Sequence, residues 1–194
     1  RHPEFDMNSR LLLHHIDFKR KVFQLDGKDY EMRDCLFPTV DPENPYQLTE
    51  EEQEIVLKLH NSFTGSEKLR KHMKCIFRYG CMYNVCNSNL LFHASMPMNA
   101  DGTLKEVEIL GNKYKGEALL KRVGQLIRTA YFAEDDHPEK AFAKDFIWYL
   151  WCGKDSPAFD KSKMATFERY FLTDKETHKE VKGYYYTLRD REDI

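Results

Sequence analysis

The sequence predicts a mixed fold of the α/β or α+β class. Segments with strand-like alternation and segments with helical periodicity intermix along the 194 residues. Hydrophobic residues make up 41% of the chain and charged residues 32%, which is typical of a globular protein rather than a disordered one. The 13 Phe, 11 Tyr and 2 Trp residues require a substantial core to bury their rings.

The N-terminal part predicts a hairpin followed by a linker. Residues 11–32 alternate apolar side chains on either side of Asp26 and Gly27, a pair that favours a two-residue turn. Residues 37–47, "FPTVDPENPYQ", contain three prolines and predict a surface loop.

Two helices are expected next. Over residues 48–63, Thr49 and Glu52 form a capping-box pattern. The apolar face of this helix is expected to comprise Ile55, Val56 and Leu59. Over residues 64–80, Thr64 with Glu67 predicts the start of the second helix, and its end is expected at Gly80.

The remainder alternates between strands and helices. Two short strands, 81–87 and 89–95, are expected to be joined around Ser88. Residues 101–116 predict another hairpin. Helices are expected over 117–132, 139–153 and 163–171. The first of these should bury Leu119, Leu120, Val123, Leu126 and Ile127.

Composition excludes several classes of function. The net charge of −2 gives no overall field that would recruit nucleic acid or an anionic membrane. No apolar run reaches the roughly 18 residues of a membrane span. Five cysteines without a CxxC pair favour reduced thiols in the cytoplasm over a disulfide framework or a zinc ribbon. The first residue is Arg and the C-terminus reads as the opening of a helix, so we expect a fragment of a longer chain.

The stretch "NLLFHASMP" predicts a metal ligand at the end of a strand. His93 follows the apolar residues 90–92, and a neutral imidazole is a good ligand for divalent metals. Ala94 and Ser95 leave room for a tight turn and a phosphate group. The alternative is a core histidine that hydrogen-bonds to the backbone. Since a catalytic metal needs about three protein ligands, His93 cannot hold one alone.

Other recognised motifs give little support. Residues 135–137 match a DxH pattern but lie in an acidic loop with no preceding apolar strand. HExxH, P-loop, GxGxxG and GxSxG patterns are absent, so nucleotide binding and serine hydrolase chemistry have no basis. No catalytic residue is therefore assigned.

A second cluster of interest is the basic and aromatic stretch 151–179. Arg169, Lys163 and Lys154 are candidate ligands for phosphate, because a guanidinium binds phosphate oxygens in pairs and an ammonium binds as a point charge. The alternative is an ordinary mixed-charge surface. The reason for this alternative is that acids are interspersed among the basic residues, namely Asp155, Asp160, Glu168, Asp174 and Glu176.

Taken together, these stretches resemble a known family. "NLLFHASMP" is similar to the strand–His–turn motif of calcineurin-like metallophosphoesterases. The runs "DGTLKEVEILGNKYKGEALL" and "DFIWYLWCGKDSPAFDKSKMATFERYF" resemble the bacterial class III fructose-1,6-bisphosphatases, and the similarity covers essentially the whole chain. One departure is that Ala94 and Ser95 stand where the metallophosphoesterase motif often has two glycines.

The resemblance implies a fold and a function. The fold would be part of a metallophosphoesterase β-sandwich flanked by helices, with helical and hairpin insertions. Residues 1–48 would form a hairpin and linker, 49–99 the core segment ending in the histidine motif, and 100–194 an insertion on the substrate side. The full enzyme would hydrolyse fructose 1,6-bisphosphate in gluconeogenesis.

The resemblance also implies cofactors and partners. A two-metal site, with Mn²⁺ and alternatively Mg²⁺, would take His93 from this chain and its other ligands from other segments of the same polypeptide. A sugar bisphosphate would be the substrate, in a cytoplasmic homo-oligomer that binds neither nucleic acid nor membrane. The alternative is a regulatory or oligomerisation segment that performs no chemistry itself.

Overall fold

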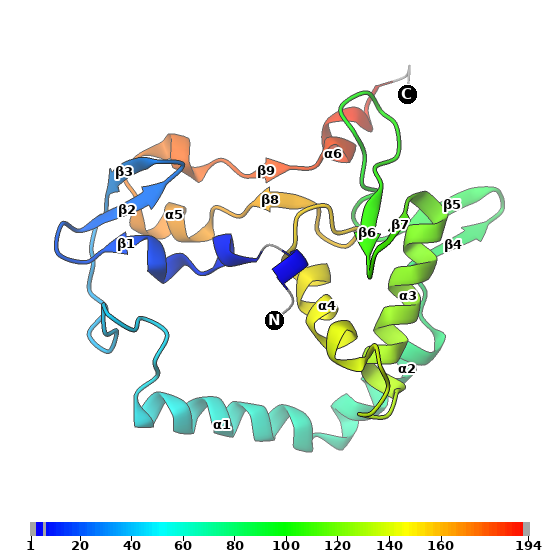
Figure 1. Ribbon diagram of the computed structural model, residues 1–194, viewed down its shortest axis with the longest axis horizontal. Helices are drawn as coiled ribbons and strands as arrows, with labels where there is room; N and C mark the ends of the chain where they lie inside the picture. Colours follow the sequence, from blue (N-terminus) through cyan, green and yellow to red (C-terminus); the bar gives the residue numbers. More distant parts are fainter. Residues whose placement is uncertain (1–2, 6, 192–194) are drawn as a thin grey trace. The chain divides into compact units, whose positions relative to one another are not determined.

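The computed structural model describes residues 3–5 and 7–191 and has the expected mixed α+β character (Figure 1). In this part of the chain, helices alternate with small antiparallel sheets, one of three strands and three of two strands. No helix among the described residues is both long and apolar enough to span a membrane. The chain divides into two compact units, and each is described by itself.

The first unit takes its described residues from the stretches Arg1–Met7, Cys75–Met164 and Glu180–Ile194. Its strands are β4 (Tyr83–Cys86), β5 (Asn89–Phe92), β6 (Val107–Ile109), β7 (Asn112–Tyr114), β8 (Lys161–Lys163) and β9 (Val181–Lys182). Its helices are η1 (Pro3–Phe5), α3 (Gly116–Phe132), α4 (Lys140–Cys152) and α6 (Tyr184–Leu188).

The core of the first unit lies between α3 and α4, which run side by side (Figure 1). The predicted apolar stripe of α3 is confirmed for four positions, and Ile127 is only partly buried. The buried positions are Leu119, Leu120, Val123 and Leu126. Helix α4 contributes Phe142 and Phe146, and the Phe5 ring stacks on Tyr149 with a centroid separation of 5.1 Å. Each fully buried apolar side chain stabilises the fold by about 1.5–3 kcal/mol.

Tight turns close both predicted hairpins of this unit. In the β4–β5 hairpin, Asn87 and Ser88 have φ angles of 49° and 62°. In the β6–β7 hairpin, Leu110 and Gly111 have φ angles of 51° and 75°. Two successive positive φ angles match the backbone twist of the flanking strands, which favours two-residue hairpin loops. Strand β5 ends at Phe92, so His93 lies directly after it rather than within it.

The second unit comprises Asn8–Lys74 and Ala165–Lys179. It holds η2 (Asn8–Arg10), η3 (Leu12–His15), β1 (Ile16–Asp17), β2 (Val22–Leu25), β3 (Lys28–Glu31), α1 (Glu50–Gly65), α5 (Thr166–Phe171) and η4 (Lys175–His178). Strands β2 and β3 form the predicted hairpin around Asp26 and Gly27. The core is small and consists of Ile16, Phe23, Met32 and Leu172.

Helix α1 begins as predicted. The Thr49 hydroxyl accepts a hydrogen bond from the Glu52 N–H, and the Glu52 carboxylate accepts one from the Thr49 N–H at 2.9 Å. The helix buries no residue, so its expected apolar face does not face a core. Ile55, Val56 and Leu59 are all more than half exposed, at 56%, 51% and 55%.

The predicted start of the second helix was wrong. Helix α2 spans Glu67–Tyr79, and the Ser66 hydroxyl accepts from the Leu69 N–H at 3.2 Å. Thr64 lies inside α1, where its hydroxyl donates to the His60 carbonyl at 2.8 Å. Both Thr64 and Ser66 can cap a helix. Because α1 continues through Gly65, Ser66 is the residue between α1 and α2. The expected end at Gly80 is confirmed.

Candidate functional site

His93 lies at the start of a turn that passes from the surface into the core. Its side chain is exposed, whereas Ser95, Met96 and Pro97 are buried. Among the described residues, His93 therefore belongs to neither core. Ala94 has a φ of 60°, in the left-handed region that favours glycine.

Two backbone bonds tie this turn together. The Ser95 N–H donates to the His93 carbonyl at 2.9 Å and to the Pro157 carbonyl at 3.1 Å. The second of these bonds joins the turn to the segment that follows α4. The position of His93 therefore depends on a loop more than 60 residues later in the chain.

A buried side-chain bond reinforces the same connection. The Ser95 hydroxyl donates to Asp160 Oδ2 at 2.5 Å, and Ser95 and Asp160 are 0% and 2% exposed. Burial raises the pKa of Asp160. The Ser95 hydrogen bond lowers this pKa, the nearby charge of Asp155 raises it, and that of Lys105 lowers it. Asp160 was expected on a mixed-charge surface and lies instead in the interior.

The loop after α4 has a fixed path. Gly153 ends the helix against the Tyr149 ring, where a Cβ would lie only 2.2 Å from the nearest ring carbon. The Tyr149 hydroxyl donates to the Lys154 carbonyl at 2.6 Å, and the Ser156 hydroxyl donates to the Leu150 carbonyl at 2.5 Å. Burial, with the charges of Asp155 and Asp160, raises the pKa of Tyr149, so this phenol stays a donor.

Lys105 bonds both to the turn after His93 and to the loop after α4. Its N–H donates to the Pro97 carbonyl at 3.0 Å, and its ammonium donates to Asp155 Oδ2 at 2.7 Å. Lys105 also lines a polar hollow of about 680 Å³, together with Lys113 and Lys115. The sequence does not indicate that Ser95 pairs with Asp160 or Lys105 with Asp155, because the partners are 65 and 50 residues apart.

The predicted phosphate ligands fall in both units. Lys154 is exposed in the loop after α4, and Lys163 is partly buried in β8. Arg169 is exposed on α5, which belongs to the second unit. Their assignment to substrate binding stays a prediction.

A metal ion would need more ligands than this site offers. Within residues 3–5 and 7–191, no three His, Cys, Asp or Glu side chains converge in a way that could hold one. An exposed imidazole on a rigid turn is suited to provide one ligand, and a catalytic site takes about three from the protein. The described residues therefore do not form a complete metal site by themselves.

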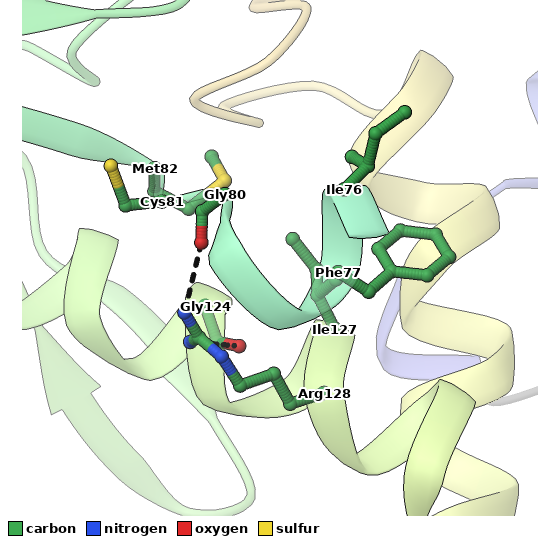
Figure 2. A pocket seen from close by; sticks show the side chains of 8 residues that line it. All are labelled: Ile76, Phe77, Gly80, Cys81, Met82, Gly124, Ile127 and Arg128. Carbon is green, nitrogen blue, oxygen red and sulfur yellow. Dashed lines mark hydrogen bonds between the residues drawn. The ribbon is translucent and has the colours of Figure 1, made fainter. Parts of the chain in front are cut away.

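An apolar pocket lies elsewhere in the first unit (Figure 2). It has a volume of about 150 Å³, and its walls include Ile76, Phe77, Met82 and Ile127. The Arg128 guanidinium donates to the Gly80 carbonyl at 2.9 Å and so fastens the end of α2 to α3. None of the predicted site residues lines this pocket.

Comparisons with known proteins agree on one family. The family described as Firmicute fructose-1,6-bisphosphatase matches residues 1–194. A relative from Phocaeicola vulgatus named "Fructose-1,6-bisphosphatase class 3" is 65% identical and covers 100% of this chain and 29% of its own length. Relatives of the same name from Bacteroides fragilis and Clostridium acetobutylicum are 63% and 50% identical, with the same coverage of both chains.

The chain thus spans under a third of the length of the relatives it matches. No solved structure matches it.

Proposed function

Because the chain belongs to the Firmicute fructose-1,6-bisphosphatase family, we propose that it forms part of an enzyme that hydrolyses fructose 1,6-bisphosphate. The reaction consumes one water and gives fructose 6-phosphate and phosphate, a step of gluconeogenesis. The observation that carries the proposal is the family match over residues 1–194. The names of the relatives, at identities from 50% to 65%, support the same activity.

In this proposal His93 supplies one nitrogen ligand to a divalent metal. Manganese is the preferred ion because imidazole favours it over the harder magnesium, which is the alternative. When bound, such an ion lowers the pKa of a bound water and stabilises charge on a phosphoryl group. The exposure of His93 and the rigid turn beneath it support this role.

The remaining ligands come from other segments of the same polypeptide. The support is that relatives are more than three times as long and that residues 3–5 and 7–191 hold no ligand cluster. By its resemblance to the family, the complete polypeptide has a calcineurin-like metallophosphoesterase core. On the same basis it assembles as a homo-oligomer in the cytoplasm.

Lys154, Lys163 and Arg169 are each a candidate ligand for the phosphate that does not react. Lys154 has the best support, because its loop is hydrogen-bonded to the turn that carries His93. Arg169 retains the chemical advantage of a planar guanidinium, which binds two phosphate oxygens at once.

A second candidate function is a regulatory or oligomerisation segment. The observation that favours it is the exposed apolar face of α1, where Ile55, Leu59 and Phe63 are 56%, 55% and 65% exposed. Under this alternative the catalytic groups lie wholly outside residues 1–194, and His93 has no role in the reaction.

One substitution in the full-length polypeptide separates the two candidates. His93→Ala should lower both bound manganese and turnover of fructose 1,6-bisphosphate by at least roughly 10–100-fold. This is the range for loss of a residue that only hydrogen-bonds to a metal ligand. The matched control is His72→Ala, which removes another exposed histidine, on α2. Unchanged metal content and turnover in His93→Ala would exclude the metal-ligand role and favour the regulatory alternative.

A further inference from the structure

The bond between Ser95 and Asp160 crosses from the turn of His93 to the segment before β8. The hydroxyl and the carboxylate oxygen are 2.5 Å apart, and both residues are buried. Ser95 is two residues from His93, so any shift of its side chain moves the peptide that presents the imidazole. The backbone bonds of Ser95 to His93 and Pro157 make this segment a single rigid unit.

Asp160 is itself held on its other side by Gly183. The Gly183 N–H donates to the Asp160 carbonyl at 2.7 Å. The carboxyl group packs directly on the glycine, and a Cβ at Gly183 would lie 2.0 Å from Asp160 Oδ2. The Asp160 carboxyl therefore lies between the Ser95 hydroxyl and the backbone that leads into α6.

Charge pairing with nearby cations does not explain why the Asp160 carboxyl is buried. Lys105 is engaged by Asp155 at 2.7 Å, and Lys161 by Glu180 at 2.8 Å. Asp160 itself forms no ion pair within the described part of the chain. Burying a carboxyl without a cation is unfavourable, so its contribution must lie in geometry rather than in stability.

We propose that Asp160 is a positioning residue, which acts through Ser95 to fix the turn that presents His93 to a metal ion. This inference rests on the proposed role of His93 as a metal ligand. Asp160 does not touch the metal or the substrate. It restricts the turn to one backbone arrangement, and Gly183 in turn restricts the carboxyl.

The test measures the affinity of the full-length polypeptide for Mn²⁺ by calorimetry. Ser95→Ala and Asp160→Ala should each weaken binding about tenfold, the low end of the range for residues that act through a ligand. Asp160→Asn keeps an oxygen that can accept from Ser95 and should bind within about twofold of the wild type, since the acceptor is retained. Hydrogen exchange of residues 93–96 should accelerate in the two alanine variants and not in Asp160→Asn.

A double-mutant cycle tests the role of Gly183. Gly183→Ala should weaken Mn²⁺ binding in the wild type, because the added methyl group displaces the carboxyl. In the Asp160→Ala background, Gly183→Ala should have little further effect on Mn²⁺ affinity, because the absent carboxyl group leaves space for the methyl group. Such non-additivity identifies a direct contact between the two residues. Equal losses of Mn²⁺ affinity in both backgrounds would show that Gly183 does not act through the Asp160 carboxyl.

Controls separate this inference from loss of fold and from the proposed function. Thr177→Ala removes another buried hydroxyl, which donates to the Asp174 carbonyl at 2.6 Å in the second unit, and should leave Mn²⁺ affinity unchanged. If His93→Ala weakens binding but Ser95→Ala and Asp160→Ala do not, the positioning role is wrong and the metal ligand stands. If His93→Ala has no effect on Mn²⁺ affinity, the proposed role of His93 as a metal ligand fails.

Discussion

At the scale of single residues, a strained backbone position directly follows His93, and buried residues follow that position. Ala94 adopts a left-handed conformation with a φ of 60°, directly after the histidine. For a residue with a Cβ this conformation costs roughly 1–2 kcal/mol, and only the surrounding bonds maintain it. Strain of this kind is common where a chain must present a functional side chain.

Ala94→Gly should increase the free energy of unfolding. Glycine removes the strain of the positive φ, and part of this gain is offset because glycine has more freedom in the unfolded chain. The net stabilisation should be about 0.5–1 kcal/mol. Denaturant unfolding of the full-length polypeptide measures it. Ala130→Gly, inside α3, should be destabilising by about 1 kcal/mol, so equal effects of the two changes would contradict the account.

The sequence predicted the place of His93 but not what holds it. An apolar run before a histidine and two small residues after it indicate a strand followed by a turn. The bond from Ser95 to Asp160 joins residues 65 positions apart, and nothing in local periodicity points to such a pair. Asp160 lies among lysines and acids in the sequence, so composition alone placed it at the surface.

At the scale of helices and strands, local chemistry decides where most elements begin and end. The hairpins closed by residues 26–27, 87–88 and 110–111 were predicted because their turns and alternation are local signals. The start of α2 was predicted incorrectly because two neighbouring hydroxyl residues compete as caps. The strand pairing of β8 with β9 was not predicted, since the two strands are short and separated in sequence.

Thr49→Ala should destabilise α1 by about 1 kcal/mol, since the helix loses its capping hydroxyl. Hydrogen exchange at the first turn of α1 measures the loss. The control is Thr64→Ala, which the corrected boundary places inside α1, where alanine is the better helix former. A larger loss for Thr64→Ala than for Thr49→Ala would contradict the structure.

The same cap should respond to pH with a defined sign. A hydrogen bond from Thr39, followed by bonds from Thr49, holds the pKa of Glu52 below its usual value. A carboxyl with a lowered pKa stabilises the folded state above its unfolded pKa, and this contribution is lost as the pH falls through the folded pKa. Protection of the first turn should therefore decrease in acid.

At the scale of the whole chain, two small cores coexist with much exposed apolar surface. Val85, Leu90 and Leu91 on the β4–β5 hairpin are 61%, 50% and 55% exposed, and Phe63 on α1 is 65% exposed. Leu90 and Leu91 point to opposite faces of the hairpin, so both faces are exposed, and a two-stranded hairpin is marginally stable by itself. The exposure of the α1 face could not be recognised from the sequence, because apolar periodicity predicts a buried face without identifying what covers it.

Residues 1–194 expressed alone should therefore lack a single sharp unfolding transition and should bind a hydrophobic dye. The physical reason is that exposed apolar patches of this extent are normally covered in a soluble monomer. Calorimetry compares the isolated segment with the full-length polypeptide. One cooperative transition without dye binding would show that the segment is self-sufficient.

The most direct measurement of the central claim is phosphate release from fructose 1,6-bisphosphate by a chimaera. In it, residues 1–194 replace the matching stretch of the Phocaeicola vulgatus relative, to which they are 65% identical. If the chain forms part of a fructose-1,6-bisphosphatase, the folded chimaera should release phosphate at a rate within about tenfold of the parent, a difference of about 1.4 kcal/mol in activation free energy. His93→Ala in the same chimaera should abolish most of this release. A chimaera that folds and assembles like the parent but releases no phosphate would contradict the account.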